Sequence, residues 1–149
     1  MDSMRSILTN DPKRVIDWVC ARTGGANLGT HATAIGLLSD GELVAGVMYD
    51  NYHRASIAMH IAGEGPHWLT REFLRVAFDY PFRQLGVFKV CGIVDSGNEA
   101  AMRFDKHLGF VEEGRIRGAC KNGCDLVFLS MTAEQCRWLQ LPMPERKAA

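Results

Sequence analysis

Residues 97–110, which read GNEAAMRFDKHLGF, decide how the chain is expected to fold. Apolar residues recur along this stretch at spacings of three and four, which is typical of an amphipathic helix: Ala100, Ala101, Phe104 and Leu108. Asn98 stands where a helix cap belongs, and Gly109 stands where a left-handed helix end belongs. The stretch therefore predicts a short helix whose two ends are both specified by its own residues.

This helix is expected to lie between two strands. An apolar run over residues 87–94 comes before it, and a second apolar run opens at Phe110. A strand followed by a short turn and a helix directs the first helical turn, and Asn98 with it, beyond the carboxyl end of the strand. Open sheets commonly bind ligands at that edge. The stretch thus also predicts a ligand site near Asn98.

Turn signals and apolar runs predict the remaining elements. Asp11 and Pro12 are expected to start a helix, because aspartate caps helices and proline suits the first turn. Thr132 is expected to cap a last helix over residues 133–139, and a long helix is expected over residues 68–85. Pro81 lacks a backbone donor and should kink or end that long helix near Tyr80. Strands are expected at residues 4–8, 33–38, 43–49, 56–62, 87–94, 110–116 and 125–131.

This order of elements predicts a mixed α/β (α+β) fold with one central sheet. The strands over residues 56–62 and 87–94 are joined through a helix, so they should lie parallel with a right-handed crossover. The other neighbours are expected to pair as antiparallel hairpins. We expect residues 1–149 to form a single domain, with residues 141–149 as a frayed tail.

The composition narrows the classes of function. Apolar residues make up 47% of the chain and charged residues 23%, and 17 basic residues balance 17 acidic ones. A neutral balance argues against general nucleic-acid binding. No stretch reads as a membrane span, and the start lacks the apolar core of a signal peptide. We therefore expect a cytoplasmic protein.

Five cysteines are scattered along the chain, which does not suggest a disulfide framework. Reduced thiols are expected instead. Cys120 and Cys124 are four residues apart, with a turn signal, Asn122-Gly123, between them. Two thiols without a second pair nearby are weak evidence for a metal site. A hairpin with incidental cysteines is the expected structure, and no metal is expected.

The motif around the 97–110 helix resembles a known family. Asn98, the helix, Leu-Gly-Phe at residues 108–110, Glu-Gly at 113–114 and the arginines that follow are similar to the signature of the GNAT N-acetyltransferases, which use acetyl-coenzyme A. Residues 78–90, FDYPFRQLGVFKV, are similar to the branch that acetylates the amino termini of ribosomal proteins. The resemblance implies a GNAT-like fold: a mostly antiparallel sheet with one splayed parallel strand pair and flanking helices.

The resemblance also implies where acetyl-CoA would bind. The parallel strands would part at their carboxyl ends, helped by a bulge on the earlier strand, and the pantetheine arm would enter the gap. The pyrophosphate would lie on a loop and a helix start, where free amides attract anions. The cofactor-binding residues implied in this way are Met59, His60, Ile61, Gly65, His67, Trp68, Leu69, Thr70, Asn98 and Phe104.

The sequence departs from the family pattern at two places. Pro66 and Trp68 occupy the positions of the glycines in the family's phosphate loop, and Pro66 removes one amide donor. Asp105 occupies the position where many members carry a tyrosine that protonates the departing thiolate. An ionised aspartate cannot donate a proton, so the identity of the general acid stays open.

Two residues are candidates for the general base that takes a proton from the attacking amine. Glu64 follows the strand end beside the expected gap, although it could equally be a solvated loop carboxylate. His60 is the second candidate, although it could be a partly buried structural histidine. Four further side chains near a turn could line an acceptor pocket or simply fill the sheet faces: Tyr49, Asp50, Tyr52 and His53.

The function implied by the resemblance is transfer of an acetyl group from acetyl-CoA to a primary amine by direct attack in a ternary complex. The acceptor could be a small molecule, a peptide terminus or a modified base, and the sequence does not choose among them. The alternative is a catalytically weak or inactive GNAT-shaped module that binds a CoA ester or a protein partner. A homodimer through the last hairpin, residues 110–131, is compatible with the sequence but is not required by it.

Overall fold

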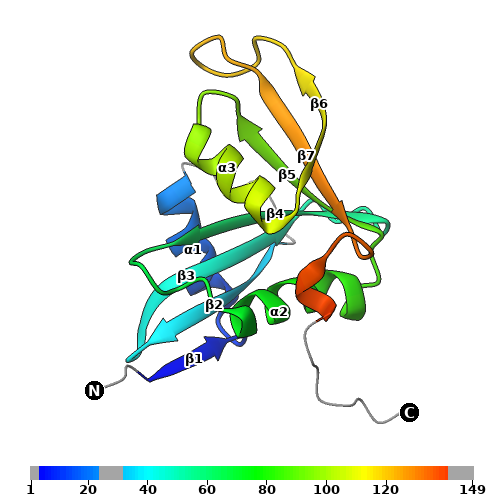
Figure 1. Ribbon diagram of the computed structural model, residues 1–149. Helices are drawn as coiled ribbons and strands as arrows, with labels where there is room; N and C mark the ends of the chain where they lie inside the picture. Colours follow the sequence, from blue (N-terminus) through cyan, green and yellow to red (C-terminus); the bar gives the residue numbers. More distant parts are fainter. Residues whose placement is uncertain (1–3, 24–31, 141–149) are drawn as a thin grey trace.

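The computed structural model describes residues 4–23 and 32–140, and its elements follow the expected order up to β7 (Figure 1). The tail predicted at 141–149 lies outside the described residues. The elements are β1 (Arg5–Leu8), α1 (Pro12–Thr23), β2 (Thr33–Ser39), β3 (Glu42–Asp50), β4 (Ser56–Gly63), α2 (Arg71–Asp79), a π-helical turn (Tyr80–Gln84), β5 (Lys89–Asp95), α3 (Glu99–Leu108), β6 (Val111–Ile116), β7 (Leu126–Thr132) and a 3-10 turn (Arg137–Gln140).

All seven strands belong to one sheet, in the order β1-β2-β3-β4-β5-β7-β6. Every neighbouring pair is antiparallel except β4 and β5, which are parallel. The prediction of a mixed sheet with one parallel pair is therefore confirmed. The parallel pair arises because α2 carries the chain from the end of β4 back to the start of β5 (Figure 1).

Apolar residues cover both faces of the sheet. On one face α1 packs against β2, β3 and β4 through Val15 and Val19. Glycines let this helix lie close: a Cβ at Gly46 would stand 2.8 Å from both of these valines. The larger cluster joins α2, the inner residues of α3 and all the central strands, and its fully buried members include Phe73 and Phe78.

The long helix predicted over residues 68–85 is shorter and changes type. It begins at Arg71 because the Thr70 hydroxyl caps it, accepting a hydrogen bond from the Phe73 amide at 3.1 Å. The α-helical part ends at Asp79, and Pro81 lies in the π-helical turn that follows. The prediction that the helix kinks or ends near Tyr80 is confirmed in its second form, because the α-helix ends at Asp79. The predicted start was three residues too early.

Pro81 leaves a carbonyl of α2 without its usual helical donor. In an α-helix the Ala77 carbonyl would accept from the amide four residues later, which is Pro81 and has no N–H. The hydroxyl of Tyr49, which is fully buried on β3, donates to the Ala77 oxygen instead. This bond ties α2 to the centre of the sheet. Tyr49 therefore belongs to the core, which matches the alternative in which it fills a sheet face.

Two further expectations about the backbone are wrong. Residues 133–139 do not form a helix capped by Thr132; a hydrogen-bonded turn over Thr132–Gln135 is followed by a short 3-10 segment. Such a short segment is a poor helix nucleus, and Trp138 anchors it by donating to the Leu108 carbonyl at 2.9 Å. The bulge expected on β4 is also missing, because β4 pairs with β3 in an unbroken register from Ala58 to Gly63.

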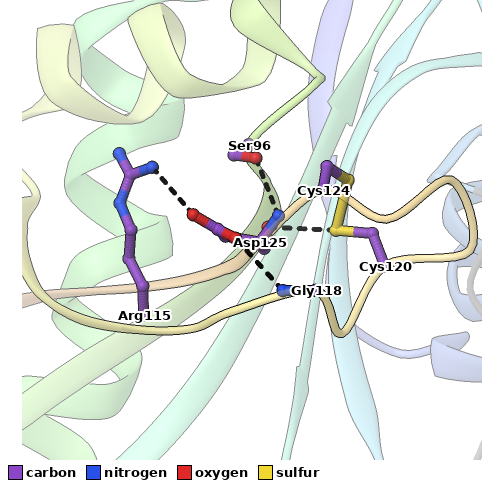
Figure 2. The surroundings of a disulfide bond; sticks show 6 residues. All are labelled: Ser96, Arg115, Gly118, Cys120, Cys124 and Asp125. Atoms are coloured by element: carbon purple, nitrogen blue, oxygen red, sulfur yellow. Dashed lines mark hydrogen bonds and ion pairs between the residues drawn. A yellow bond between two sulfur atoms is a disulfide. The ribbon is translucent and has the colours of Figure 1, made fainter.

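The expectation of reduced cysteines throughout is wrong for one pair. Cys120 and Cys124 form a disulfide in the loop between β6 and β7, with Cα atoms 4.9 Å apart (Figure 2). The expected turn at this place is present, and Gly123 in it has a positive φ of 78°. Cys20, Cys91 and Cys136 are free thiols. No helix in the described parts of the chain is long and apolar enough to cross a membrane.

Candidate functional site

The site begins where β4 and β5 stop pairing. Their parallel register covers only Ser56 with Lys89, Ile57 with Val90, and Ala58 with Cys91. Beyond these pairs β4 continues along β3 as far as Gly63, and β5 continues along β7 as far as Asp95. Residues 59–63 of β4 therefore present a strand edge that has no strand partner on the β5 side. An unpaired edge offers backbone donors and acceptors to a ligand.

A cavity of about 730 Å³ occupies this opening. Its walls are β4 from Met59 onward, β5 from Gly92 onward, the inner side of α3, and the indole of Trp68; Arg22 from the end of α1 closes one side. A cavity of this size is within the range that holds a cofactor or a drug-sized ligand. The expected splayed pair is therefore present, with a real cavity between its strands.

Both ends of α3 are formed as the sequence predicts. The Asn98 side-chain oxygen accepts from the Ala101 amide at 3.1 Å, so it caps the helix. The Asn98 amide donates to the Asp95 carbonyl at 2.9 Å, which fixes the turn from β5 into α3. Gly109 ends the helix in the left-handed conformation, with φ of 118°. Asn98 thus has a structural role and also lines the cavity.

His60 has an acidic partner on the neighbouring strand. Its Nε2 lies 2.8 Å from Oδ1 of Asp50, and both side chains are largely buried, with 29% and 12% of their surfaces exposed. The two residues stand diagonally on paired strands, since Asp50 faces Ala58 in the β3–β4 register. From the sequence, Asp50 was expected either to line an acceptor pocket or to fill a sheet face. Its contact with His60 was not predicted, because it depends on the register between β3 and β4.

Asp105 is a second, half-buried acid of the site. It lines the cavity from α3, and its Oδ2 lies against β5, 3.4 Å from where a Cβ at Gly92 would stand. Burial disfavours the carboxylate and raises the pKa of Asp105 to about 6, while the positive charge of a protonated His60 acts in the opposite direction. From the sequence, Asp105 was expected to be ionised and unable to donate a proton. With this raised pKa, a fraction of the Asp105 carboxyl is protonated near neutral pH.

Glu64 lies at the rim of the cavity, but a cation binds it. Its Oε1 accepts from Nε of Arg22 at 2.6 Å, and more than half of its side chain is exposed. The same guanidinium stacks on Trp18, 3.7 Å from the ring centroid. An exposed, ion-paired carboxylate is a poor proton acceptor compared with a neutral imidazole. The arrangement matches the alternative in which Glu64 is a solvated loop carboxylate.

Trp68 narrows one end of the cavity. A Cβ at Gly63 would stand 2.1 Å from the indole, so only glycine lets the ring lie against the end of β4. The ring also packs against Phe104 of α3, with centroids 5.7 Å apart. The loop after β4 and the helix after β5 therefore meet across the opening through two aromatic side chains.

The structure brings together seven of the residues predicted for the site. Those that line the cavity are Met59, His60, Ile61, Glu64, Trp68, Asn98 and Phe104. The other four, Gly65, His67, Leu69 and Thr70, lie along the loop before α2 and do not line the cavity. Leu69 packs against the core, the Thr70 amide donates to the Trp68 carbonyl at 2.9 Å, and the His67 carbonyl accepts from Arg5.

Comparison with known proteins gives matches in structure only. No protein-family model matches the sequence, and no curated protein matches it. Mutant forms of the spermidine/spermine N-acetyltransferase SpeG from Vibrio cholerae superimpose with a TM-score of 0.67 at 15% identity, over 89% of this chain and 96% of that chain.

A probable acetyltransferase gives a TM-score of 0.58 at 23% identity, over 80% of this chain and 70% of that chain. A GNAT-family acetyltransferase from Bacillus anthracis gives a TM-score of 0.57 at 13% identity, over 68% of this chain and 66% of that chain. These identities are low, so the likeness concerns the fold: the chain has the mixed α/β fold of the GNAT acetyltransferases.

Proposed function

We propose that this protein transfers an acetyl group from acetyl-CoA to a primary amine, by direct attack within a ternary complex. One observation supports this proposal above the others: the pairing of β4 with β5 stops after Ala58 and Cys91, and a cavity of about 730 Å³ opens beside the free edge of β4. The pantetheine arm of CoA contains amide groups, which can pair with such an edge as an added strand would.

The residues around the cavity suit the two ends of the CoA molecule differently. Met59, His60 and Ile61 would hold the pantetheine arm along β4, with Asn98 and Phe104 beside it on α3. The amides from Gly65 to Thr70 and the start of α2 would face the pyrophosphate. Pro66 contributes no amide there and the Thr70 amide is already bonded, so this second contact is weaker than the family pattern implies.

His60 is the general base in this proposal. With Nε2 donating to Asp50, the neutral ring presents Nδ1 as a proton acceptor, and the carboxylate stabilises the imidazolium that forms. His60 takes a proton from the acceptor's ammonium group, which leaves a neutral amine able to attack the thioester carbon. We prefer His60 to Glu64 because Arg22 neutralises the Glu64 carboxylate.

Asp105 is the general acid. A carboxyl group whose pKa is raised to about 6 still transfers a proton favourably to a thiolate, since the conjugate thiol has a pKa of about 8.5. The nitrogen of the tetrahedral intermediate loses its remaining extra proton to solvent, and the proton that His60 gained also returns to solvent. The proton that Asp105 gives to the departing sulfur is replaced from solvent, so one proton is released per amine acetylated. Backbone amides on the free edge of β4 donate to the thioester oxygen as charge develops on it.

The acceptor is a primary amine in this proposal. The SpeG structures carry the name of a spermidine N-acetyltransferase, and residues 78–90 are similar to enzymes that acetylate peptide termini. Polyamines and short peptides are therefore the first two acceptor classes to test. The alternative function, a module that binds a CoA ester without turnover, draws support from the altered loop at Pro66 and the ion-paired Glu64.

The test measures binding and turnover separately on the full chain. Acetyl-CoA should raise the melting temperature, because a ligand at about 100 times its Kd stabilises the folded state by about 2.7 kcal/mol. Release of free CoA thiol is then followed with spermidine and with short peptides as acceptors. His60→Gln should lower kcat/KM by about 10²–10⁴-fold. His107→Gln, on the exposed side of α3, is the matched control and should leave kcat/KM unchanged.

Each outcome distinguishes the alternatives. Absence of a thermal shift with millimolar acetyl-CoA would count against both the enzyme and the binding module. A shift without thiol release over the whole acceptor panel would favour the binding module. Turnover that is equal in His60→Gln and His107→Gln would remove His60 from the mechanism while leaving acetyl transfer in place.

A further inference from the structure

A second group of reactive side chains lies at the end of β5, beside the cavity. It consists of Asp95, the last residue of β5, and of Cys120 and Cys124 in the loop between β6 and β7. One carboxylate oxygen and the two sulfur atoms all lie within 4.8 Å of one another. We propose that these three residues bind a thiophilic divalent cation such as Zn²⁺ when Cys120 and Cys124 are reduced.

The chemistry and the spacing of these ligands suit zinc. Two cysteines separated by three residues fall within the C-x₂₋₄-C spacing of zinc sites, and carboxylate is a known third ligand. Bonds of about 2.3 Å to each sulfur at tetrahedral angles place the two sulfur atoms about 3.8 Å apart. The three ligand atoms need only small shifts to reach that geometry. Three protein ligands leave a fourth position for water or a ligand, as in catalytic zinc sites.

The backbone around the group is held without help from the disulfide. The Asp125 amide donates to the Ser96 hydroxyl at 2.9 Å, and the Ser96 amide donates to the Asp125 carbonyl at 2.8 Å (Figure 2). The Asp125 carboxylate accepts from the Gly118 amide at 3.1 Å and pairs with Arg115. These bonds join the β6–β7 loop to the residue that follows Asp95. The three ligands therefore stay close together after the disulfide is opened.

Oxidation and metal binding exclude each other at this site. Opening the disulfide takes two electrons and two protons; a phosphine reductant supplies the electrons, water supplies the protons and an oxygen atom, and the phosphine leaves as its oxide. The products are two thiols, of which Cys120 can donate to the Asp125 carbonyl 3.0 Å away. Binding of the divalent cation then releases up to two thiol protons, because thiolates are the ligands.

The proposed metal site adjoins the cavity and shares Asp95 with it. Asp95 lines the cavity, and its carbonyl accepts from the Asn98 amide that begins α3. A Cβ at Gly97 would stand 3.9 Å from the sulfur of Cys124, so the loop packs directly on the β5–α3 turn. A cation here would place positive charge at the cavity rim. The proposal does not rest on acetyl transfer, and its test uses no acetyl-CoA.

Cobalt is the spectroscopic probe. The full chain is reduced with a phosphine, freed of reductant under anaerobic conditions and titrated with Co²⁺, then with Zn²⁺. We expect a sulfur-to-cobalt charge-transfer band that saturates at one equivalent and is displaced by Zn²⁺. Oxidised protein and Cys120→Ser/Cys124→Ser should lack the band. Cys20→Ser, which removes a free thiol that is not part of the group, should retain it. Asp95→Asn should keep the band but weaken Co²⁺ binding by at least about tenfold.

A second measurement uses the unaltered sequence and so does not depend on the folding of any variant. Reduced protein is alkylated with and without Zn²⁺, and each cysteine is followed by mass spectrometry. Zn²⁺ should slow the modification of Cys120 and Cys124 but not of Cys20. Absence of the cobalt band in reduced protein, or equal alkylation of the pair with and without Zn²⁺, would overturn the proposal. Unchanged affinity in Asp95→Asn would overturn the assignment of Asp95 as a ligand.

Discussion

Replacing Asp105 with asparagine should stabilise the protein at neutral pH but not in acid. The Asp105 carboxyl is half-buried on α3, and the loss of hydration raises its pKa from 3.8 in the unfolded chain to about 6 in the folded one. The folded state therefore binds the proton more tightly than the unfolded state does. Below about pH 4 both states are protonated, and the residue adds no pH-dependent cost. Between about pH 4 and about pH 6, the Asp105 carboxyl ionises in the unfolded state but stays largely protonated in the folded state. The free energy of unfolding therefore falls as the pH rises through this range.

The size of this effect follows from the difference between the two pKa values. About two pKa units at 1.36 kcal/mol each amount to about 3 kcal/mol of lost stability above about pH 6. Asparagine has nearly the same shape and cannot ionise, so it should recover most of this loss. For a domain of this size, about 3 kcal/mol should move the urea midpoint by about 1–2 M at neutral pH.

The assay is urea unfolding of the wild type and of Asp105→Asn from about pH 4 to about pH 8. Glu134→Gln, which removes an exposed carboxylate in the turn after β7, is the control. Its urea midpoint should have the same pH dependence as that of the wild type. The advantage of Asp105→Asn should grow with pH and level off above about pH 6. A constant difference between the two proteins at every pH would refute the reasoning, since only ionisation of Asp105 makes the difference depend on pH.

Two other substitutions test packing around the site. Tyr49→Phe should cost about 1–3 kcal/mol of stability in urea unfolding, because it leaves the buried Ala77 carbonyl without a donor; a change within measurement error would show that this carbonyl finds another donor. Gly63→Ala should displace the Trp68 indole, lowering stability by about 1–3 kcal/mol and changing the tryptophan fluorescence. Gly114→Ala, where a Cβ meets nothing within 4 Å, should do neither, and equal effects at both glycines would contradict the packing argument.

Local sequence signals predicted most of the fold. The ends of α3 follow from Asn98 and Gly109, whose capping geometry depends on neighbouring residues alone, and the structure confirms both. The strands expected at residues 33–38 and 43–49 are present as β2 and β3, with Asp40 and Gly41 in the turn between them. The predicted start of α2 was wrong because apolar periodicity continues through Trp68 and Leu69, which pack on the core from a loop. Periodicity reports burial, and only the Thr70 cap marks where the helix begins.

The site was less predictable because its interactions join distant segments. Arg22 and Glu64 are 42 residues apart and meet only because α1 packs across β4. The disulfide was missed for a different reason. An odd number of scattered cysteines does not indicate which of them pair, and the distance between the Cys120 and Cys124 sulfur atoms depends on the conformation of one loop. The burial of Asp105 likewise depends on how α3 settles against Gly92, which no local pattern specifies.

The short pairing of β4 with β5 divides the main-chain hydrogen bonding of the sheet into two parts. Strands β1 to β4 form one part and strands β5 to β7 the other. Three residue pairs join them, together with hydrogen bonds from the Phe88 and Lys89 amides to the Ala55 carbonyl. A ligand that contacts both β4 and β5 would join the two parts of the sheet. Amide hydrogen exchange in β5 and β7 should then slow, even at residues far from the ligand. Ligand binding in the cavity would then be detectable as slower local unfolding of these strands.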